Sequence, residues 1–534
     1  MARTLNETVR SVTEDYLNNV LNVNNPPIAS DIEAELMSLT RDALILENQS
    51  RAKGDKLTLP TKLFPSQIAD IMLKLYPIVR ICCGGTNADP AYDLLAIYVD
   101  SGVDEGIYTT DEDVFKRLAR GFNYSMTGRE MSDTLELLKI NAPRVNRTVE
   151  KDLIAVGNGI FDYKTKDLLP FDSKYVFMAK SHVNYNSNVK NVSIHNNADG
   201  TDWDVESWMR ELSDDPEVVE LLWEVLGAIV RPFVSWNKSV WFYSNTGNNG
   251  KGTLCALMRN LLGEGSYAAI PLTDFSKDFA LEPLTRATAI ITDENDVGTF
   301  IDKAANLKAI ITHDVIPINR KFKTPISYQF YGFMVQCLNE FPRVKDTSDS
   351  FYRRQIFVPF EKCFTGIERE YIKNDYLKRD EVLEYVLYKV LNMNYYQLSD
   401  PASCRKALAE YKDYNDPVRQ FLDDIVPDLQ WDLVPFGFLY DLYKAWFKKN
   451  APNGKIQGRN TFIQDVLNIL KDYPHWYCQG RTTAIRPGSK MDKPEPLIMT
   501  YNLTDWMNPH YSGPDPNKLC CPEIKATYNG ILRV

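Results

Sequence analysis

A lysine stands between a glycine-rich turn and an apolar, helix-like stretch in the segment WFYSNTGNNGKGTLCALMRNLL, residues 241–262. A phosphate site needs backbone N–H groups that converge in a tight turn, the positive end of a helix dipole, and a cation that reaches the β- and γ-phosphates. The segment offers all three, with the lysine as the cation. The predicted ATP-binding residues are Asn245, Gly247, Asn248, Asn249, Gly250, Lys251, Gly252 and Thr253.

This segment departs from the usual GxxxxGK[ST] pattern at two positions. Asn245 holds the first glycine position, and asparagine tolerates left-handed backbone geometry better than most residues. Gly252 replaces the hydroxyl residue that usually binds Mg²⁺, so Thr253, one place later, becomes the candidate metal ligand. Taken alone, the segment is also compatible with a glycine-rich turn that carries a surface lysine.

Two carboxylates end the next strongly apolar segment, ATAIITDEND, residues 287–296. An aspartate at the carboxyl end of a strand can hold Mg²⁺ through water, and a neighbouring glutamate can polarise the attacking water. We therefore expect Asp293 to be a metal ligand and Glu294 to be catalytic. An acidic pair in a polar turn is common, but directly after a phosphate loop it indicates hydrolysis of ATP with Mg²⁺ as cofactor.

Three further polar side chains flank two apolar strands. Asn339 follows the strand predicted over YQFYGFMVQCL, residues 328–338. A strand that lies between the two preceding ones would bring this amide to the γ-phosphate or to the attacking water. Arg353 and Arg354 precede the apolar strand of SFYRRQIFVPF. Such an arginine can pair within its own subunit or reach a neighbour's site as an arginine finger.

Two basic regions are candidates for nucleic-acid contact. Arg320, Lys321 and Lys323 surround Phe322 in HDVIPINRKFKTPISYQF, which we predict to be a hairpin loop. Cations interleaved with an aromatic ring suit a phosphate backbone, and a solvated turn is the alternative. The second region, residues 441–490, has nine basic against three acidic side chains, a net charge of +6 in a chain of net charge −10.

The second basic region belongs to a predicted winged helix. The amphipathic helices FGFLYDLYKAWFKKN and NTFIQDVLNILKD are followed by a predicted hairpin, WYCQGRTTAIRPG…PLIMTYNL. The second helix would read bases through Asn460, Thr461 and Gln464, with the wing on phosphates. A basic face that docks on an acidic neighbour is the alternative. The predicted DNA-binding residues here are Lys455, Arg459, Arg481 and Arg486.

Composition bounds the class of protein. A chain of 534 residues exceeds one ordinary core, and 44% hydrophobic with 25% charged residues is typical of a folded protein. We find no apolar run near the roughly 18 residues that span a bilayer, so no membrane partner is expected. Nine cysteines without a CxxC motif indicate reduced thiols and a cytoplasmic location.

The predicted fold class is α/β, with a mainly parallel sheet where strands and helices alternate. Two hairpins are expected before it, one turning at SGVDEG and one at the pair Asn158–Gly159. Polar residues 184–201 form a predicted linker. The expected domains are a helical region 1–90, an α+β domain 91–200, a motor domain 201–365 with a helical lead-in 205–230, a helical linker 366–416, and a winged-helix-like domain 417–534.

Five segments in order, NTGNNGKGT, IITDEND, INRKFK, VQCLNEFP and YRRQIFVPF, resemble the superfamily 3 helicases of viruses, phages and plasmids, which are hexameric AAA+ motors. The likeness is greatest to the poxvirus and satellite-phage primase–helicases and covers about residues 235–362. It implies that Lys251 is the Walker A lysine, that Asp293 and Glu294 are the Walker B pair, and that Asn339 is the sensor. It also implies a DNA-gripping hairpin at 320–323 and an arginine finger at Arg354, with Arg353 in reserve.

The expected function is therefore an ATP-dependent replicative DNA helicase of a phage, plasmid or other mobile element. The resemblance implies a hexameric ring around one strand, with duplex DNA bound by the C-terminal domain. The helical region before the hairpins is too short for a primase domain, so primase activity is not expected in this chain. Residues 1–80 could form a collar, recruit a separate primase or polymerase, or serve packing alone. Scattered histidines argue against a nicking initiator. A small-molecule phosphotransferase, suggested by the GKGT sequence, and an ATP-switched origin-binding protein are the alternatives.

Overall fold

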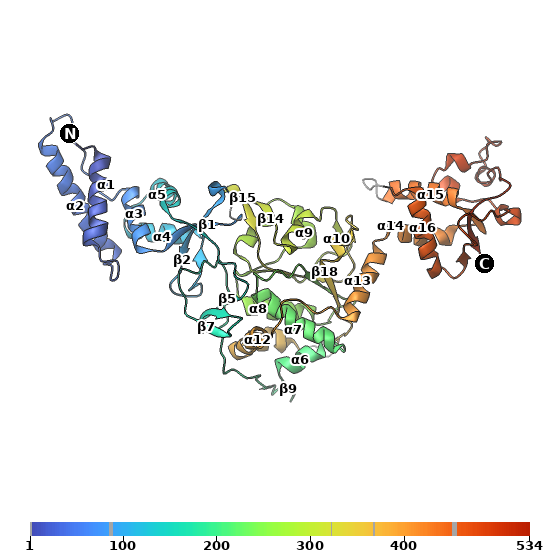
Figure 1. The fold of residues 1–534 in the computed structure, drawn as a ribbon, viewed down its shortest axis with the longest axis horizontal. Coiled ribbons are helices and arrows are strands. Elements are labelled where there is room, and N and C mark those ends of the chain that lie inside the picture. Colours follow the sequence, from blue (N-terminus) through green and yellow to red (C-terminus); the bar gives the residue numbers. More distant parts are fainter. Residues whose placement is uncertain (1–2, 85–88, 322, 367–368, 451–455) are drawn as a thin grey trace. The chain divides into compact units, whose positions relative to one another are not determined.

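The computed structural model describes residues 3–84, 89–321, 323–366, 369–450 and 456–534. The chain forms two compact units. The first comprises residues 1–299, 303–340 and 353–405, and the second comprises 300–302, 341–352 and 406–534. Figure 1 labels their elements. Among the described residues, no helix has the length and apolar character needed to cross a membrane.

The first unit begins with helices packed on a small sheet of strand order β3-β2-β1-β4. The helices are α1 (Leu5–Asp15), a π-helical turn (Tyr16–Val20), α2 (Ala29–Gln49), α3 (Pro65–Leu75), α4 (Glu112–Gly121) and α5 (Gly128–Asn141). The strands are β1 (Ile78–Cys82), β2 (Leu94–Tyr98), β3 (Tyr108–Thr109) and β4 (Arg144–Asn146). The hairpin predicted at SGVDEG is confirmed, because β2 and β3 pair antiparallel on either side of it.

A second antiparallel sheet contains β5 (Leu153–Val156), β6 (Gly159–Asp162) and β7 (Asp167–Leu169). The predicted hairpin is present, but its predicted turn pair is wrong by one residue. Val156 pairs with Gly159, so Gly157 and Asn158 make the turn. Packing requires the glycine, because a Cβ on Gly157 would lie 2.6 Å from Asn184 Oδ1.

The helical lead-in predicted over 205–230 is two helices, α6 (Val205–Glu211) and α7 (Pro216–Val230). The chain breaks because Asp215 caps α7, accepting a hydrogen bond from the Glu217 N–H at 3.0 Å, and Pro216 has no N–H for a continuous helix. The stretch predicted as a linker contains β8 (Ile194–His195), which pairs antiparallel with β9 (Asp202–Trp203).

The central sheet is fully parallel in all its pairings, with strand order β11-β12-β16-β10-β18. Its strands are β10 (Ser239–Tyr243), β11 (Tyr267–Ala268), β12 (Ala289–Thr292), β16 (Phe333–Leu338) and β18 (Gln355–Pro359). The predicted α/β class with a mainly parallel sheet is thereby confirmed. Because the strands are parallel, the turns that follow them meet at one edge.

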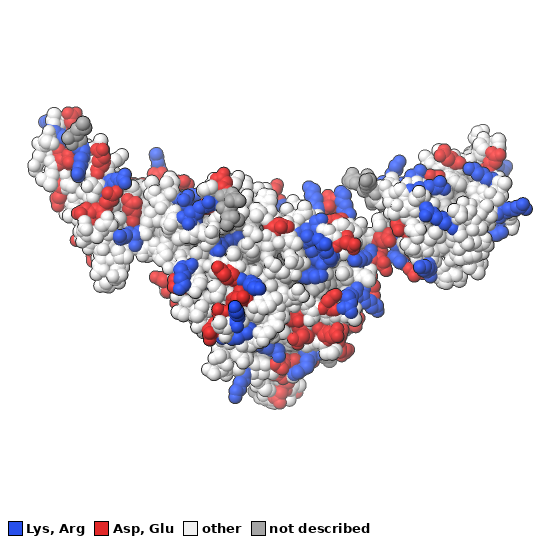
Figure 2. Space-filling model, in the orientation of Figure 1, with Lys and Arg blue, Asp and Glu red and all other residues white. Residues whose placement is uncertain are grey.

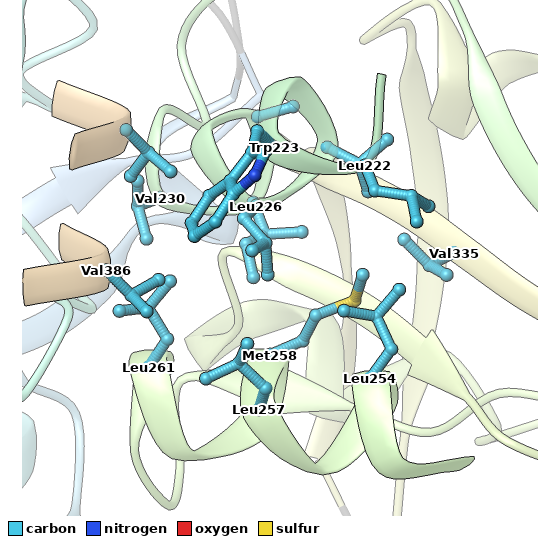
Figure 3. Close-up of a cluster of buried hydrophobic side chains, with 14 of the residues drawn as sticks. Leu222, Trp223, Leu226, Val230, Leu254, Leu257, Met258, Leu261, Val335 and Val386 are labelled. Carbon is cyan, nitrogen blue, oxygen red and sulfur yellow. The ribbon is translucent and has the colours of Figure 1, made fainter. Parts of the chain in front are cut away.

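Apolar helices fix the position of the helix that follows β10. Side chains of α7, α8 (Lys251–Leu262) and α12 (Asp380–Asn392) point toward one another and toward Val335 of β16 (Figure 3). Leu226, Leu254 and Leu257 among them have no exposed surface. α8 thus has its apolar face buried, so the first turn of the helix is held against the sheet.

The first unit also contains an antiparallel hairpin of β14 (Val315–Arg320) and β15 (Lys323–Gln329), as predicted for this segment. The single strand predicted over 328–338 is wrong, because β15 ends at Gln329 and β16 begins at Phe333. Gly332 packs tightly between the two strands; a Cβ there would lie 2.5 Å from Thr288 O. The unit's other helices are α9 (Ala305–Ile311) and α11 (Glu370–Asn374).

The second unit contains the chain's C-terminal elements and a three-stranded antiparallel sheet of order β19-β21-β20. Its strands are β13 (Phe300–Ile301), β17 (Arg343–Val344), β19 (Leu433–Pro435), β20 (Trp476–Tyr477) and β21 (Gly530–Arg533). Its helices are α10 (Asp349–Tyr352), α14 (Pro417–Ile425), α15 (Phe436–Asn450), α16 (Arg459–Ile469), α17 (Leu497–Thr500) and α18 (Pro516–Leu519), and α13 (Ala402–Tyr414) leads into it.

The two amphipathic helices predicted in this unit are confirmed as α15 and α16, whereas the predicted local hairpin after them is wrong. Trp476 and Tyr477 pair with Arg533 and Leu532 at the end of the chain. The segment PLIMTYNL is helical instead, because it contains α17. An apolar run of this length is compatible with either state, and tertiary burial of Leu497 and Ile498 selects the helix.

Candidate functional site

The predicted phosphate loop joins β10 to α8, with the chain turning through two left-handed residues. Asn248 has a φ of 50° and Gly250 a φ of 87°. A Cβ on Gly250 would also lie 2.7 Å from Leu212 Cδ2, so both backbone and packing require glycine there. Asn245, expected in the left-handed region, does not have a positive φ; its Oδ1 accepts a hydrogen bond from Tyr243 OH.

The loop is held in shape by its own polar groups and by residues 363–365. Lys251 N–H donates to Asn249 Oδ1 at 3.3 Å, and Asn249 Nδ2 donates to Thr246 O. Phe364 N–H donates to Asn248 O at 2.7 Å. Packing does not require glycine at position 247, because a Cβ there would meet no described atom within 4 Å. These hydrogen bonds fix the shape of the loop.

Lys251 lies where the phosphate loop becomes helix and is only 5% exposed. Burial lowers the pKa of its ammonium group. Its Nζ donates to Asn339 Oδ1 at 3.0 Å. Asn339 follows β16, which lies between β10 and β12 as predicted. The structure thus brings together a lysine and an amide that are distant in the sequence.

Asp293 and Glu294 follow β12 at the same edge of the sheet. Asp293 binds Arg259 of α8, whose Nη1 donates to Asp293 Oδ2 at 2.8 Å. This contact raises the pKa of Arg259. Glu294 is exposed, and its side chain makes no hydrogen bond to any residue that the structure describes. Sequence reasoning missed Arg259, although a lone cation on a buried helix two turns after Lys251 was a signal.

A cavity of about 420 Å³ lies beside the loop, within the size range of small-molecule sites. The loop and α8 contribute Asn248, Gly250 and Thr253 to its lining. The other lining residues are apolar (Trp208, Leu212, Phe364 and Ile372) or polar (Glu211, Arg369, Glu370, Lys373 and Asn374). Gly252 faces open space nearby, because a Cβ there would meet only Lys373 Nζ, at 3.9 Å. Packing therefore does not forbid a hydroxyl residue at position 252.

The candidate metal ligands fit Mg²⁺ in part. A carboxylate has enough lone pairs for Asp293 to keep Arg259 and still accept from metal-bound water, and a threonine hydroxyl is a suitable oxygen ligand. Among the described residues, however, no hydrogen bond joins Thr253 to Asp293. No cluster of three or more histidine, cysteine, aspartate or glutamate side chains is present in the described ranges.

Arg353 and Arg354 lie at the opposite edge of the central sheet. Ser239 N–H, at the start of β10, donates to Arg354 O at 2.7 Å, and Lys238 Nζ donates to Arg353 O at 2.7 Å. The five residues of β10 separate this edge from the phosphate loop by roughly 16 Å at about 3.3 Å per residue. Within one chain, the structure does not bring either arginine to Lys251.

The tip of the β14–β15 hairpin carries the predicted basic residues, and Phe322 lies outside the described residues. Lys323 Nζ forms an ion pair with Glu112 Oε1 of α4 at 2.7 Å. Arg320 Nη2 donates to Thr324 O at 2.9 Å, and Lys321 N–H donates to Glu282 Oε2 at 3.4 Å. The charged groups of Arg320 and Lys323 and the backbone of Lys321 are therefore in contact with residues of the same unit.

Arg147, which sequence reasoning missed, connects the base of this hairpin to the small N-terminal sheet. Its Nη2 donates to Gln329 O at 2.6 Å and to Cys83 O at 3.2 Å. Its guanidinium lies over the rings of Tyr328 and Tyr331. Gln329 N–H also donates to Cys83 O at 2.8 Å. β15 is thus tied to the chain just after β1.

In the second unit, α16 presents an exposed polar face formed by Asn460, Thr461, Gln464 and Asn468. Arg481 Nη2 donates to Asn460 Oδ1 at 3.0 Å, which joins the segment after β20 to this face. Arg459 and Arg486 are exposed, and Lys455 lies outside the described residues. Figure 2 shows both signs of charge interspersed over the visible face of the molecule.

Two family models match parts of the chain. Residues 242–354 match a family of unknown function (DUF5906), and residues 413–506 match the poxvirus D5 protein-like family. The first match spans the predicted residues from Asn245 to Arg354. The second confirms the resemblance to poxvirus-type proteins, and it lies in the second unit rather than in the five segments that suggested it. No curated protein matches the chain.

The solved structures similar to this chain include two of the C-terminal region of NrS-1. One, the A form apo structure, is 15% identical with a TM-score of 0.41, over 80% of this chain and 98% of that one. Another apo structure is 15% identical with a TM-score of 0.40, over 79% of this chain and 97% of that one. Likeness at this level leaves the function open.

Proposed function

We propose that this protein is an ATP-driven DNA helicase that acts in replication. The observation that carries the proposal is the hydrogen bond between Lys251 Nζ and Asn339 Oδ1 at 3.0 Å, at the sheet edge where the acidic pair also lies. One strand, β16, separates the lysine's strand from that of the carboxylates. In this proposal, the γ-phosphate lies between Lys251 and Asn339 on one side and the two carboxylates on the other.

ATP would lie across the phosphate loop, with its base in the adjoining cavity. Lys251 would leave Asn339 for the γ-phosphate, because a phosphate is a stronger partner for an ammonium than a neutral amide. Glu294, whose side chain makes no hydrogen bond to any described residue, would orient the attacking water. Mg²⁺ would be held by Thr253 and, through water, by Asp293, and would supply charge neutralisation between the phosphates.

The position of the arginines supports assembly of several subunits. Arg354 and Arg353 lie at the edge of the sheet away from their own phosphate loop, so a role in hydrolysis requires the site of a neighbour. A closed ring places one subunit's edge against the next subunit's site at every interface. We infer a hexameric AAA+ ring of this kind, with Arg354 as the finger.

The candidate DNA contacts lie outside the buried site. The β14–β15 hairpin would carry Arg320, Lys321 and Lys323 along one strand in the channel. In the second unit, the helices α14, α15 and α16 together with the antiparallel sheet β19-β21-β20 support a winged helix, with α17 and α18 inserted between β20 and β21. Its exposed helix α16 would contact duplex DNA, with Arg481 and Arg486 on phosphates and Lys455 and Arg459 alongside.

The test is steady-state ATP hydrolysis by the full chain with and without single-stranded DNA, beside Lys251→Ala. We expect DNA to stimulate turnover and the variant to lose at least about a hundredfold, since it removes a charge that stabilises the transition state. Lys164→Ala, an exposed lysine outside the site, is the matched control and should behave as wild type.

Three results would contradict the proposal. Undiminished turnover in Lys251→Ala would show that the phosphate loop is not the active site. Lys251-dependent turnover that DNA does not change would favour a phosphotransferase, and acceptor nucleotides would then be screened. Binding of ATP without hydrolysis in the presence of DNA would favour an origin-binding switch.

A further inference from the structure

A buried polar network joins the turn of the acidic pair to the strand of Asn339. Asn295, which follows Glu294, is 8% exposed, and Gln336 of β16 is fully buried. Asn295 Nδ2 donates to Gln336 Oε1 and to Cys337 O, both at 3.0 Å. Its Oδ1 accepts from Leu272 N–H at 2.8 Å. The side-chain amide therefore has partners for both its donor and its acceptor group.

The network continues into the chain before β12. Gln336 Nε2 donates to Ile270 O at 3.0 Å. Thr292 Oγ1 accepts from Ile270 N–H at 3.1 Å and lies 3.0 Å from Ile270 O, to which it donates. Three buried side chains thus fasten residues 270–272, the end of β12 and the end of β16 to one another. Buried amides with all their bonds made hold a single geometry, because every alternative leaves a polar group unpaired.

Through Asn295, the network anchors the turn that contains Glu294. The backbone pairing of β12 with β16 ends at Thr292 and Gln336, so the ladder stops before the acidic pair. Beyond that point Asp293 is held by Arg259, and Asn295 is held by β16. Glu294 lies between these two anchored residues, and its own side chain has no hydrogen-bond partner among the described residues.

We propose that Asn295 is a positioning residue that holds Glu294 in a fixed relation to Asn339. The proposal rests on the proposed function, since it assigns the water-orienting role to Glu294. Cys337, which accepts from Asn295, lies two residues before Asn339, so the amide ties both catalytic turns to one rigid strand. Without Asn295, the turn keeps its Arg259 anchor on one side of Glu294, and its next contact with another segment of the described chain is the Gly298 N–H bond to Glu340 Oε2 at 3.1 Å, so the carboxylate can move away from the attacking water.

The test compares Asn295→Ala with the milder Gln336→Met in the full chain. Nucleotide affinity depends on the phosphate loop and the cavity, which the network does not touch. We therefore expect Asn295→Ala to lower kcat about tenfold to a hundredfold while KM for ATP and the Kd of a fluorescent ATP analogue stay within about twofold. Gln336→Met leaves the bond to Cys337 O, so its loss of kcat should be smaller, about threefold to tenfold.

Gln67→Met is the matched control for loss of a buried amide. Gln67 is 1% exposed and donates to Thr13 and Thr40 hydroxyls at 3.1 Å, away from the site. It should lower the melting temperature much as Gln336→Met does, yet keep the wild-type kcat. Because Gln336→Met retains the apolar bulk of the side chain, it keeps the test decisive even if Asn295→Ala is poorly folded.

Three outcomes would overturn the positioning role. These are a wild-type kcat in both network variants, a loss that appears in nucleotide affinity rather than in kcat, and an equal loss of kcat in Gln67→Met. Failure of the proposed function looks different, because the wild-type chain itself would then hydrolyse no ATP.

Discussion

The phosphate loop and the basic hairpin of the first unit both depend on lysines, but their surroundings are opposite. Lys251 is 5% exposed, and its Nζ is bound to an amide that a sheet holds in place. The Lys323 side chain is 47% exposed, and its partner Glu112 is 45% exposed. One lysine is positioned by packing, whereas the other is positioned by an ion pair in contact with water.

This difference teaches how each site would respond to its ligand. In the buried site, packing and hydrogen bonds hold the side chains in place, so even a small displacement of one of them should lower the rate of hydrolysis strongly. In the exposed hairpin, an ion pair is worth only about 0–1 kcal/mol, so a phosphate can displace the carboxylate at little cost. We therefore expect large, specific effects from substitutions in the first region and small, graded, salt-dependent effects in the second.

The largest effect should come from Glu294→Gln, which tests whether substitutions near the buried lysine have larger effects than substitutions in the exposed hairpin. The substitution keeps shape and removes only the charge that polarises water, so kcat should fall about a hundredfold to ten-thousandfold. The side chain is exposed and has no hydrogen-bond partner in the described part of the chain, so the melting temperature should not change. Single-turnover ATP hydrolysis and calorimetry measure both quantities.

Asp293→Asn is the comparison variant for this prediction. It also removes activity but should lower the melting temperature, because it removes the charge that pairs with half-buried Arg259. A Glu294→Gln variant with wild-type turnover would end its assignment as the water-orienting residue.

A smaller effect is expected from Glu112→Gln. Loss of the carboxylate frees Lys323 for phosphate, so affinity for single-stranded DNA should rise about twofold to fivefold at low salt, within the range of one exposed ion pair. Fluorescence anisotropy with a labelled oligonucleotide measures it. Asp113→Asn is the control, since Asp113 pairs with Lys116 at 3.4 Å and not with the hairpin.

The lysine variant completes this test. Lys323→Ala should weaken DNA binding, and adding Glu112→Gln to it should then have no further effect. An equal gain from Glu112→Gln in the presence and absence of Lys323 would show that the carboxylate acts by general repulsion instead.

The smallest effect should come from Arg486→Ala in the second unit. If this exposed arginine contacts one phosphate of duplex DNA, the slope of log affinity against log salt should decrease by about one. ATP hydrolysis without DNA should remain unchanged. Filter binding over a salt series measures the slope, and an unaltered slope would remove Arg486 from the DNA contacts.

Local patterns in the sequence predicted much of the buried site. A strand, a glycine-rich turn and a helix are contiguous from 241 to 262, so the position of Lys251 followed from neighbouring residues alone. The parallel strands followed from the alternation of apolar segments and turns, whereas the place of β16 between β12 and β10 was an expectation that the strand order confirms. Patterns failed where partners are distant. Trp476 pairs with Arg533, more than fifty residues later in the chain, and no local pattern indicates such a partner. The segment PLIMTYNL is helical because burial, rather than the propensity of its residues, decides the structure of a short apolar run.

Several residues of the site could not be found from the sequence. Arg259 and Asn295 lie inside segments that the sequence pattern singled out, and Arg147 lies outside them, but no local pattern identifies the partner of any of the three, which is 34 to 182 residues away in the chain. Arg147 is unremarkable in NAPRVNRTVE, yet it joins the hairpin base to the small sheet. Asn295 reads as part of a polar turn until β16 is placed beside it.

The sequence by itself determined the chemical groups of the phosphate site, since a strand–loop–helix encodes its own geometry within about twenty residues. It also determined the parallel sheet, because apolar strands alternating with helices have few other ways to bury their faces. Only the tertiary structure decided which lysine is buried and which is ion-paired, what holds Asp293, and what fastens the turn beside Glu294. These depend on contacts between segments far apart in the chain, and such contacts exist only once the sheet has brought their ends to one edge.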